Sequence, residues 1–194
     1  WRLALQHAWL VAASTAAAVA LGVPLGVLAA RRPRLRALVL GATGLLQTVP
    51  SLAMLALLIW ATGTIGAWPT WLALLLYALL PIVRNTCTGL LEVPRGQRPA
   101  GLALGLTPGA VLRRIELPLA APVIASGVRT AAVIGVGTAT IAAFVGAGGF
   151  GERIVTGLAL NDRELLLAGA LPSALMAIAI EIVFERIERR LRRR

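Results

Sequence analysis

Residues 8–30 read AWLVAASTAAAVALGVPLGVLAA, and residues 31–36 read RRPRLR. The first stretch carries no charged side chain and is longer than the roughly 20 apolar residues that a helix needs to cross the hydrocarbon core of a bilayer. Four arginines follow it directly. An apolar run closed by arginines is typical of a transmembrane helix whose basic end faces the cytoplasm. This part of the chain therefore predicts a membrane protein.

Further apolar stretches of the same kind follow. The predicted spans are residues 8–30, 37–60, 71–90, 118–145 and 165–184, about five in all. Because proline removes a helical hydrogen-bond donor, we expect the second span to be kinked or broken at Pro50. An uncharged loop over 61–70, a polar segment over 91–117, a glycine-rich loop over 146–164 and a charged tail over 185–194 complete the chain. The sequence thus predicts an all-α fold, a polytopic membrane bundle, with residues 1–194 forming a single transmembrane domain.

The composition agrees with a membrane bundle and disfavours other classes. Hydrophobic residues make up 58% of the chain and the mean hydropathy is +0.84, more than a soluble domain needs for its core. The net charge is +11 and all 19 basic residues are arginines; their placement between apolar runs indicates orientation rather than nucleic-acid binding. The single cysteine, Cys87, and the single histidine, His7, form no disulfide, metal or hydrolytic pattern, so we expect no enzymatic activity and no cofactor. We interpret His7 as a polar group at the membrane interface.

The arginines also predict the orientation. Four lie after the first span, four after the third and six in the tail from Arg186, whereas the opposite side holds only Arg2, Arg153 and Arg163. Since basic residues favour the cytoplasmic side, we expect the N-terminus outside and the C-terminus in the cytoplasm. The tryptophans fall in segments assigned to the outer boundary: Trp1, Trp9, Trp60, Trp68 and Trp71. They are typical of an interfacial aromatic belt, the alternative being contact with an extracytoplasmic partner.

Three charges, Arg84, Arg129 and Glu181, lie inside predicted spans. At 1.5 Å per residue, each is on the order of 7–15 Å from the cytoplasmic end of its span. Charges at this depth are costly and are usually paired or face water, so Glu181 can pair with Arg129 or with Arg84. The alternative is that both arginines extend to the interface. Gly22 and Gly26 form a G-x-x-x-G pair, which predicts close helix packing.

Residues 146–151 read GAGGFG and match the G-x-G-x-x-G pattern of dinucleotide sites. Such a site needs a preceding strand and a following helix, whereas here a membrane span precedes the glycines. We interpret them as a tight, mobile extracytoplasmic turn.

The polar segment 91–117 carries more helix signals than a linker needs. Pro99 can open a helix and Gly105 can close it. Thr107 and Pro108 are typical of the N-cap and the first residue of a second helix. Two short helices joined by a glycine would form a compact cytoplasmic knob, which suggests docking to a soluble partner.

This knob resembles the coupling motif of ABC-importer permeases, E-A-A-x-x-x-G followed by I-x-L-P, with the motif's spacing found here over residues 99–118. Pro99 stands in place of the motif's Glu and Gly101 in place of its second Ala. The resemblance implies a coupling-helix segment over about 91–117 that contacts an ATPase. Its implied ATPase-coupling residues are Ala100, Gly101, Gly105, Thr107, Pro108, Ile115, Leu117 and Pro118.

Other stretches are similar to permeases for glycine betaine, carnitine and choline, namely QTVPSLA (47–53), YALLPIVRNT (77–86), GTATIAA (137–143) and LALND (158–162). The resemblance extends over about residues 5–191. It implies a set of candidate path or gate residues: Gln47, Pro50, Ser51, Asn85, Thr138 and Thr140.

The resemblance also implies the setting, a multi-pass permease subunit in the bacterial cytoplasmic (inner) membrane. Two permease subunits, identical or not, would form the path for a quaternary ammonium osmolyte. Separate ABC ATPase subunits would hydrolyse ATP, and an extracytoplasmic substrate-binding protein would deliver the solute. Because such a cation is best held by an aromatic cage and aromatic residues are few here, we expect specificity to reside in the binding protein.

Other interpretations remain open. The chain could be a permease for another small solute such as an amino acid. It could also be a non-ABC secondary transporter or a channel, but neither a midplane carboxylate nor an inverted repeat is visible. A membrane scaffold without transport would leave the knob unexplained.

Overall fold

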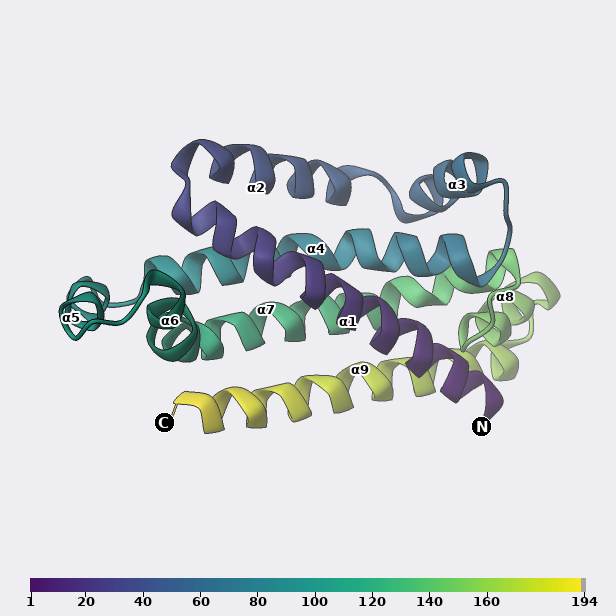
Figure 1. The fold of residues 1–194 in the computed structure, drawn as a ribbon. Helices are drawn as coiled ribbons and strands as arrows, with labels where there is room; N and C mark the ends of the chain where they lie inside the picture. The colour runs from purple at the N-terminus through teal and green to yellow at the C-terminus, as the bar shows by residue number, and fades with distance from the viewer. Residues whose placement is uncertain (193–194) are drawn as a thin grey trace.

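The computed structural model describes residues 1–192, and every regular element in that range is helical (Figure 1). The elements are α1 (Arg2–Arg31), α2 (Pro33–Thr48), α3 (Ser51–Thr62), α4 (Ala67–Leu91), α5 (Gln97–Ala103), α6 (Pro108–Val111), the π-helical turn η1 (Leu112–Glu116), α7 (Leu117–Thr138), the 3₁₀ helix η2 (Ala139–Val145), α8 (Gly151–Leu160) and α9 (Arg163–Arg192). The all-α expectation is confirmed. Arg193 and Arg194 of the predicted tail lie outside the described residues.

Four helical segments in the described range are long and apolar enough to cross a membrane: α1, α4, Pro108–Val145 and α9. Helices α2 and α3 qualify together as a fifth, bent by 102° at the break between Thr48 and Ser51. The break falls at Pro50, as the sequence predicts. Figure 1 shows α1, α4, α7 and α9 running along the length of the bundle, with α2 and α3 along one side of α4.

Helix α4 lies at the centre of the bundle and packs against α1 and α7. Its Leu74, Ile82 and Val83 side chains are fully buried. At the crossing with α1, a Cβ on Gly26 would lie 2.5 Å from the Cβ of Thr86 and 2.9 Å from the Val83 carbonyl oxygen. The predicted close packing at Gly22 and Gly26 is therefore confirmed, since no larger residue fits at Gly26 without moving α4.

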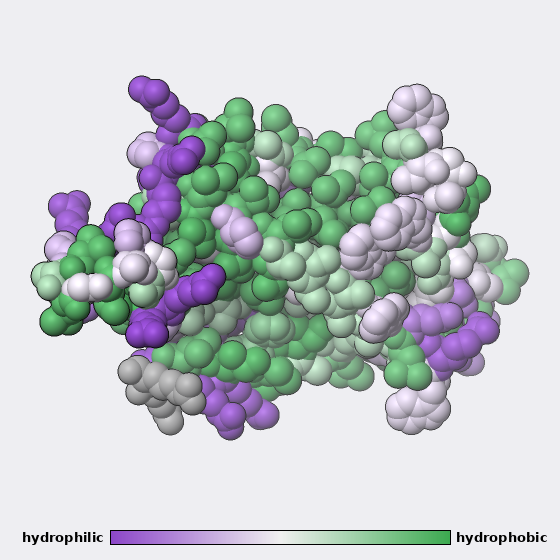
Figure 2. Space-filling model, in the orientation of Figure 1, coloured by the Kyte–Doolittle hydropathy of each residue, from purple (hydrophilic) through white to green (hydrophobic). Residues whose placement is uncertain are grey.

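The two ends of the bundle differ in chemistry. Figure 2 shows a broad apolar band between a strongly hydrophilic end, which carries α5 and α6, and the end where the N-terminus lies. We call the first the arginine-rich end; its arginines include Arg31, Arg32, Arg34, Arg36, Arg95, Arg98, Arg113 and Arg114, together with Arg189, Arg190 and Arg192 at the end of α9. The tryptophans lie toward the N-terminal end, where Trp68 and Trp71 stack with ring centroids 5.2 Å apart.

Several segments differ from the sequence expectations. The predicted loop over 146–164 contains a helix, α8, and the predicted tail continues α9 to Arg192. His7 is fully buried rather than interfacial, because α1 begins at Arg2 and presents it to the turn before α8. Its Nε2 donates to the Val136 carbonyl oxygen at 3.0 Å, and its Nδ1 accepts from the Phe150 N–H at 3.4 Å.

The turn that we expected to be mobile is anchored by these contacts. Gly148 and Gly149 have φ values of +86° and +87°, which only glycine adopts readily. The Gly149 N–H donates to Gln6 Oε1 at 3.4 Å. The glycines therefore let the backbone approach α1 closely, and the start of α1 holds the turn.

Candidate coupling site at the arginine-rich end

Helix α5 ends in a Schellman motif at the glycine that the sequence singles out. Gly105 has a φ of +81°. The Leu106 N–H donates to the Gly101 carbonyl oxygen at 3.1 Å, and the Gly105 N–H donates to that of Leu102 at 3.0 Å. These are the two hydrogen bonds that define the motif. The expected helix stop at Gly105 is present, although α5 begins at Gln97, before Pro99.

The second helix of the knob begins as expected. Thr107 is the N-cap of α6, and its Oγ1 accepts a hydrogen bond from the Ala110 N–H at 3.3 Å. Pro108 takes the first helical position, where its missing N–H costs no hydrogen bond. The chain then passes through η1 into α7, which starts at Leu117 and Pro118.

The two arms of the knob pack against each other at Gly101. A Cβ there would lie 2.7 Å from Ile115 Cδ1 and 3.1 Å from Val111 Cγ2. Gly101 is buried, whereas Ala100 beside it is exposed. The glycine that departs from the motif's second Ala thus lets Ile115 and Val111 reach the α5 backbone.

An ion pair fastens the knob to the bundle. The carboxylate of Glu116, the last residue of η1, accepts a hydrogen bond from the guanidinium of Arg31 at the end of α1. Glu116 is only 6% exposed, and a buried carboxylate needs such a partner. The knob is therefore attached to the end of α1 through this pair as well as to α7 through the chain.

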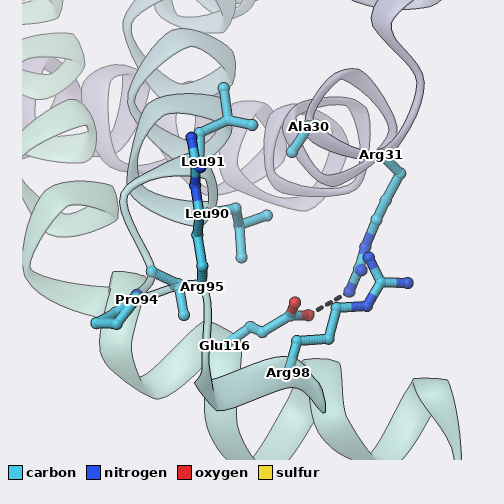
Figure 3. A pocket seen from close by; sticks show the side chains of 9 residues that line it. Ala30, Arg31, Leu90, Leu91, Pro94, Arg95, Arg98 and Glu116 are labelled. Carbon is cyan, nitrogen blue, oxygen red and sulfur yellow. Dashed lines mark hydrogen bonds and ion pairs between the residues drawn. The ribbon is translucent and has the colours of Figure 1, made fainter.

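A cavity of about 240 Å³ lies between the knob and the ends of α1 and α4. Figure 3 shows the Arg31–Glu116 pair on one side with Arg98 beside it, while the Arg95 side chain extends toward Leu91 on the other side. The remaining lining is apolar and comes from Ala30, Leu90, Leu91, Val93 and Pro94.

Two of the three charges predicted inside the spans, Arg129 and Glu181, form a cluster with Glu188 between α7 and α9. Arg129 Nη1 lies 3.2 Å from Glu181 Oε1, and Arg129 Nε lies 3.2 Å from Glu188 Oε1. The structure thus places Glu181 against Arg129 and not against Arg84. Arg84 is exposed and forms no ion pair within residues 1–192.

The break between α2 and α3 is tied to α4 by two side chains. Pro81 has no N–H, so the carbonyl oxygen of Tyr77, four residues earlier, lacks its helical donor. Gln47 Nε2 supplies one at 2.8 Å. In return the Tyr77 hydroxyl donates to the Val49 carbonyl oxygen, beside Pro50. The bent segment is thereby held at a defined place on α4.

The other candidate path or gate residues are not gathered at one place. Asn85 Nδ2 donates to the Pro81 carbonyl oxygen at 2.8 Å and packs against Gly127 of α7. Thr138 ends α7, and Thr140 Oγ1 donates to the Gly137 carbonyl oxygen at 2.7 Å. Ser51 begins α3. Ser51 lies at the break between α2 and α3, and Asn85 lies one turn after Pro81 of α4. Thr138 and Thr140 lie toward the N-terminal end of the bundle.

Sequence reasoning missed Glu116, Glu188 and Tyr77. Glu116 occupies the variable position of I-x-L-P, and Glu188 falls in what was expected to be a charged tail. Glu188 lies seven positions after Glu181, which is two helical turns and therefore the same face of α9. If the last helix is continued past residue 184, this spacing predicts that Glu188 lies on the same face as Glu181.

Comparison with known proteins agrees with this architecture. Residues 22–193 match the family of binding-protein-dependent transport system inner membrane components. The chain is 48% identical over 175 residues to the glycine betaine/carnitine/choline transport system permease protein OpuCD of Bacillus subtilis, covering 90% of this chain and 76% of the relative. It is 45% identical over 190 residues to the osmoprotectant import permease protein OsmW of Salmonella typhimurium, covering 96% and 88%.

The fold is also found among solved transporters. An inward-facing structure of the MetNI methionine ABC transporter superposes with a TM-score of 0.80 at 24% identity, covering 95% of this chain and 94% of that one. The sequence relatives define the class as the permease subunit of a binding-protein-dependent transport system, and the chain shares its fold with an ABC-transporter chain. This chain belongs to the family of inner membrane components of binding-protein-dependent transport systems, and its resemblance to permeases for osmoprotectants is confirmed.

Proposed function

We propose that the chain is the permease subunit of an ATP-driven importer for quaternary ammonium osmolytes of the glycine betaine, choline and carnitine type. It contributes half of the translocation path, pairs with a second permease subunit and receives the solute from an extracytoplasmic binding protein. A separate ATPase subunit hydrolyses ATP. The names of the relatives at 45–48% identity support the solute class.

The observation that carries the coupling role is the folded knob over residues 97–116. Its two helices are capped by the Gly105 and Thr107 motifs, and Glu116 ties it to Arg31. Leu102 and Leu104 at its tip are 42% and 83% exposed. Exposed apolar side chains on a rigid, charged projection are suited to docking in a groove of a soluble partner.

The proposed orientation in the membrane rests on the arginine-rich end of the bundle. The arginine-rich end carries α5, α6 and the end of α9, and basic residues favour the cytoplasm. The ATPase would therefore dock on the cytoplasmic side, with the N-terminus and α8 outside. The tryptophans toward the other end support this assignment.

The path is proposed to run beside the irregular helices around α4. Gln47, Pro50 and Ser51 mark the 102° break, and Asn85 lies where α4 meets α7. Broken helices at membrane depth are tolerated where they are buried in protein or line a water-filled path.

Two experiments test the proposal. Co-purification of the tagged chain from its native membrane should recover an ABC ATPase, and its absence would refute the coupling role. Proteoliposomes of the reconstituted complex should take up labelled glycine betaine, choline or carnitine only with ATP inside. Uptake of an amino acid in place of all three would refute the solute class but not the transporter class.

A further inference from the structure

The cavity at the arginine-rich end carries more positive charge than its protein neighbours balance. Arg31, Arg95 and Arg98 line it, and Glu116 is the one acidic residue in its lining. Figure 3 shows the guanidinium group of Arg98 beside that of Arg31, with Glu116 joined to Arg31. Three arginines against one glutamate leave an excess of two positive charges.

The two other arginines have no protein counter-ion. Within residues 1–192, neither Arg95 nor Arg98 forms an ion pair with a carboxylate. Both residues are exposed, and the positive charges that line the cavity repel one another unless an anion lies between them. The planar guanidinium fork matches the oxygens of a phosphate group, so arginines that line a cavity without a counter-ion are suited to hold one.

The rest of the lining indicates where such a phosphate comes from. Leu90, Leu91 and Val93 form an apolar wall at the edge of the apolar band, and Leu91 is 50% exposed. With the apolar band in the bilayer, this edge would lie at the level of the lipid headgroups, and basic pockets between transmembrane helices on the cytoplasmic side bind the headgroups of anionic lipids.

We propose that this cavity binds a phosphate group, held by Arg95 and Arg98 with the Arg31–Glu116 pair behind them. An anionic lipid offers the phosphate at the right depth, and a soluble phosphate compound offers the same chemistry. Because Arg98 belongs to α5 and Arg31 to α1, the bound group would bridge the knob and the bundle. The proposal does not depend on which solute is transported.

The test compares the purified full-length chain with the double variant Arg95→Gln/Arg98→Gln. The matched control is Arg113→Gln/Arg114→Gln, which removes the same charge from exposed positions of η1 that do not line the cavity. Each protein is reconstituted in nanodiscs of phosphatidylcholine alone or of an equal mixture with phosphatidylglycerol, and native mass spectrometry counts the retained anionic lipids. Thermal unfolding is also followed with inorganic phosphate against chloride at equal ionic strength.

The expected result is a loss of about one retained phosphatidylglycerol per chain in the Arg95/Arg98 variant and none in the control. If lipid retention is equal but phosphate stabilises the wild type and not the variant, the site is supported with a soluble ligand. Equal behaviour of wild type and variant in both assays would overturn the proposal. The same variants are also tested for co-purification of the ATPase. If the Arg95/Arg98 variant loses the ATPase but matches the wild type in both other assays, these arginines contact the partner protein and the phosphate site is refuted.

Discussion

Arg129 on α7 and Glu188 on α9 lie with Nε and Oε1 3.2 Å apart, and this contact joins two helices near the arginine-rich end of the bundle. Glu188 is 9% exposed at its side chain, whereas Glu181, on the other side of the same guanidinium, is 50% exposed. The Glu188 oxygen is buried and lacks the alignment of a hydrogen bond. The contact is therefore mainly electrostatic, and Arg129 screens two carboxylates from each other.

This arrangement predicts a ranking of three substitutions. Arg129→Gln should lower the free energy of unfolding most, by about 3–5 kcal/mol, because it leaves two carboxylates facing each other without a cation. Glu188→Gln should cost on the order of 1–3 kcal/mol, and Glu181→Gln no more than about 1 kcal/mol, since that pair is screened by solvent. Thermal or denaturant unfolding in detergent measures the ranking.

Double-mutant cycles give the control for this ranking. Arg129→Gln/Glu188→Gln should recover part of the Arg129→Gln loss, whereas Arg84→Gln and Glu181→Gln should be additive, since Arg84 is exposed and lies in no ion pair of the described chain. Coupling between Arg84 and Glu181 together with additivity at Arg129 would contradict the structure.

The Arg31–Glu116 pair predicts a different outcome, loss of coupling rather than of the bundle. Glu116→Gln should leave Arg31 without its counter-ion and loosen η1 from the end of α1. The free energy of unfolding should fall by about 1–3 kcal/mol. ATP hydrolysis by the complex should then respond less to the loaded binding protein. Glu185→Gln, which breaks the exposed pair with Arg189, is the matched control and should change neither property. Undiminished stimulation in Glu116→Gln would show that the pair does not transmit motion.

The His7 contacts predict that the start of α1 and the turn before α8 are stabilised together. His7→Ala should leave the Val136 carbonyl oxygen and the Phe150 N–H without partners and open a void beside the Phe150 ring, whose centroid is 5.1 Å away. A loss of about 2–4 kcal/mol is expected. Gln6→Ala, which removes one long hydrogen bond to Gly149, should cost less than about 1 kcal/mol. Equal losses would mean that the histidine is not the anchor.

These contacts also show which structural features could be predicted from the sequence. The Gly105 stop, the Thr107 cap and the break at Pro50 depend on residues within a few positions, so local rules predict them. His7 and Val136 are 129 positions apart, and Arg31 and Glu116 are 85 apart. Such pairings follow from how α1 crosses the bundle, and no local pattern contains them. The α8 helix was missed for another reason, because the glycines beside it suggested a loop.

The proposed orientation predicts opposite labelling at the two ends. In a Cys87→Ser background, a cysteine at Arg34 should be protected from an impermeant thiol reagent added outside cells, and a cysteine at Ala67 should react. Both positions are exposed in the structure, whereas Cys87 is buried, so differences in reactivity report the side of the membrane. Permeabilised cells provide the control, in which both positions should react. The reverse pattern in intact cells would overturn the orientation.

The last prediction separates backbone conformation from side-chain contact in the knob. A β-branched residue at Gly105 would be forced into a φ of +81°, which costs on the order of 1–2 kcal/mol and tilts α6 relative to α5. Gly105→Val should leave membrane insertion and the bundle intact, weaken association with the ATPase and abolish transport. The binding protein should keep its affinity for the solute, because it does not contact this segment. Pull-down of the ATPase and uptake in proteoliposomes are the measurements.

The neighbouring glycine Gly96 supplies a matched control. An added Cβ meets nothing within 4 Å at either glycine, but Gly96 has a φ of −76°, which any residue adopts. Gly96→Val should therefore retain ATPase association, although it carries the same side chain only nine positions away in the same exposed segment. Gly105→Asn should be intermediate, because asparagine tolerates the left-handed conformation better than valine does. If valine at both positions weakens association equally, added bulk is responsible and the helix stop is not; if neither substitution has an effect, the knob does not couple the bundle to an ATPase.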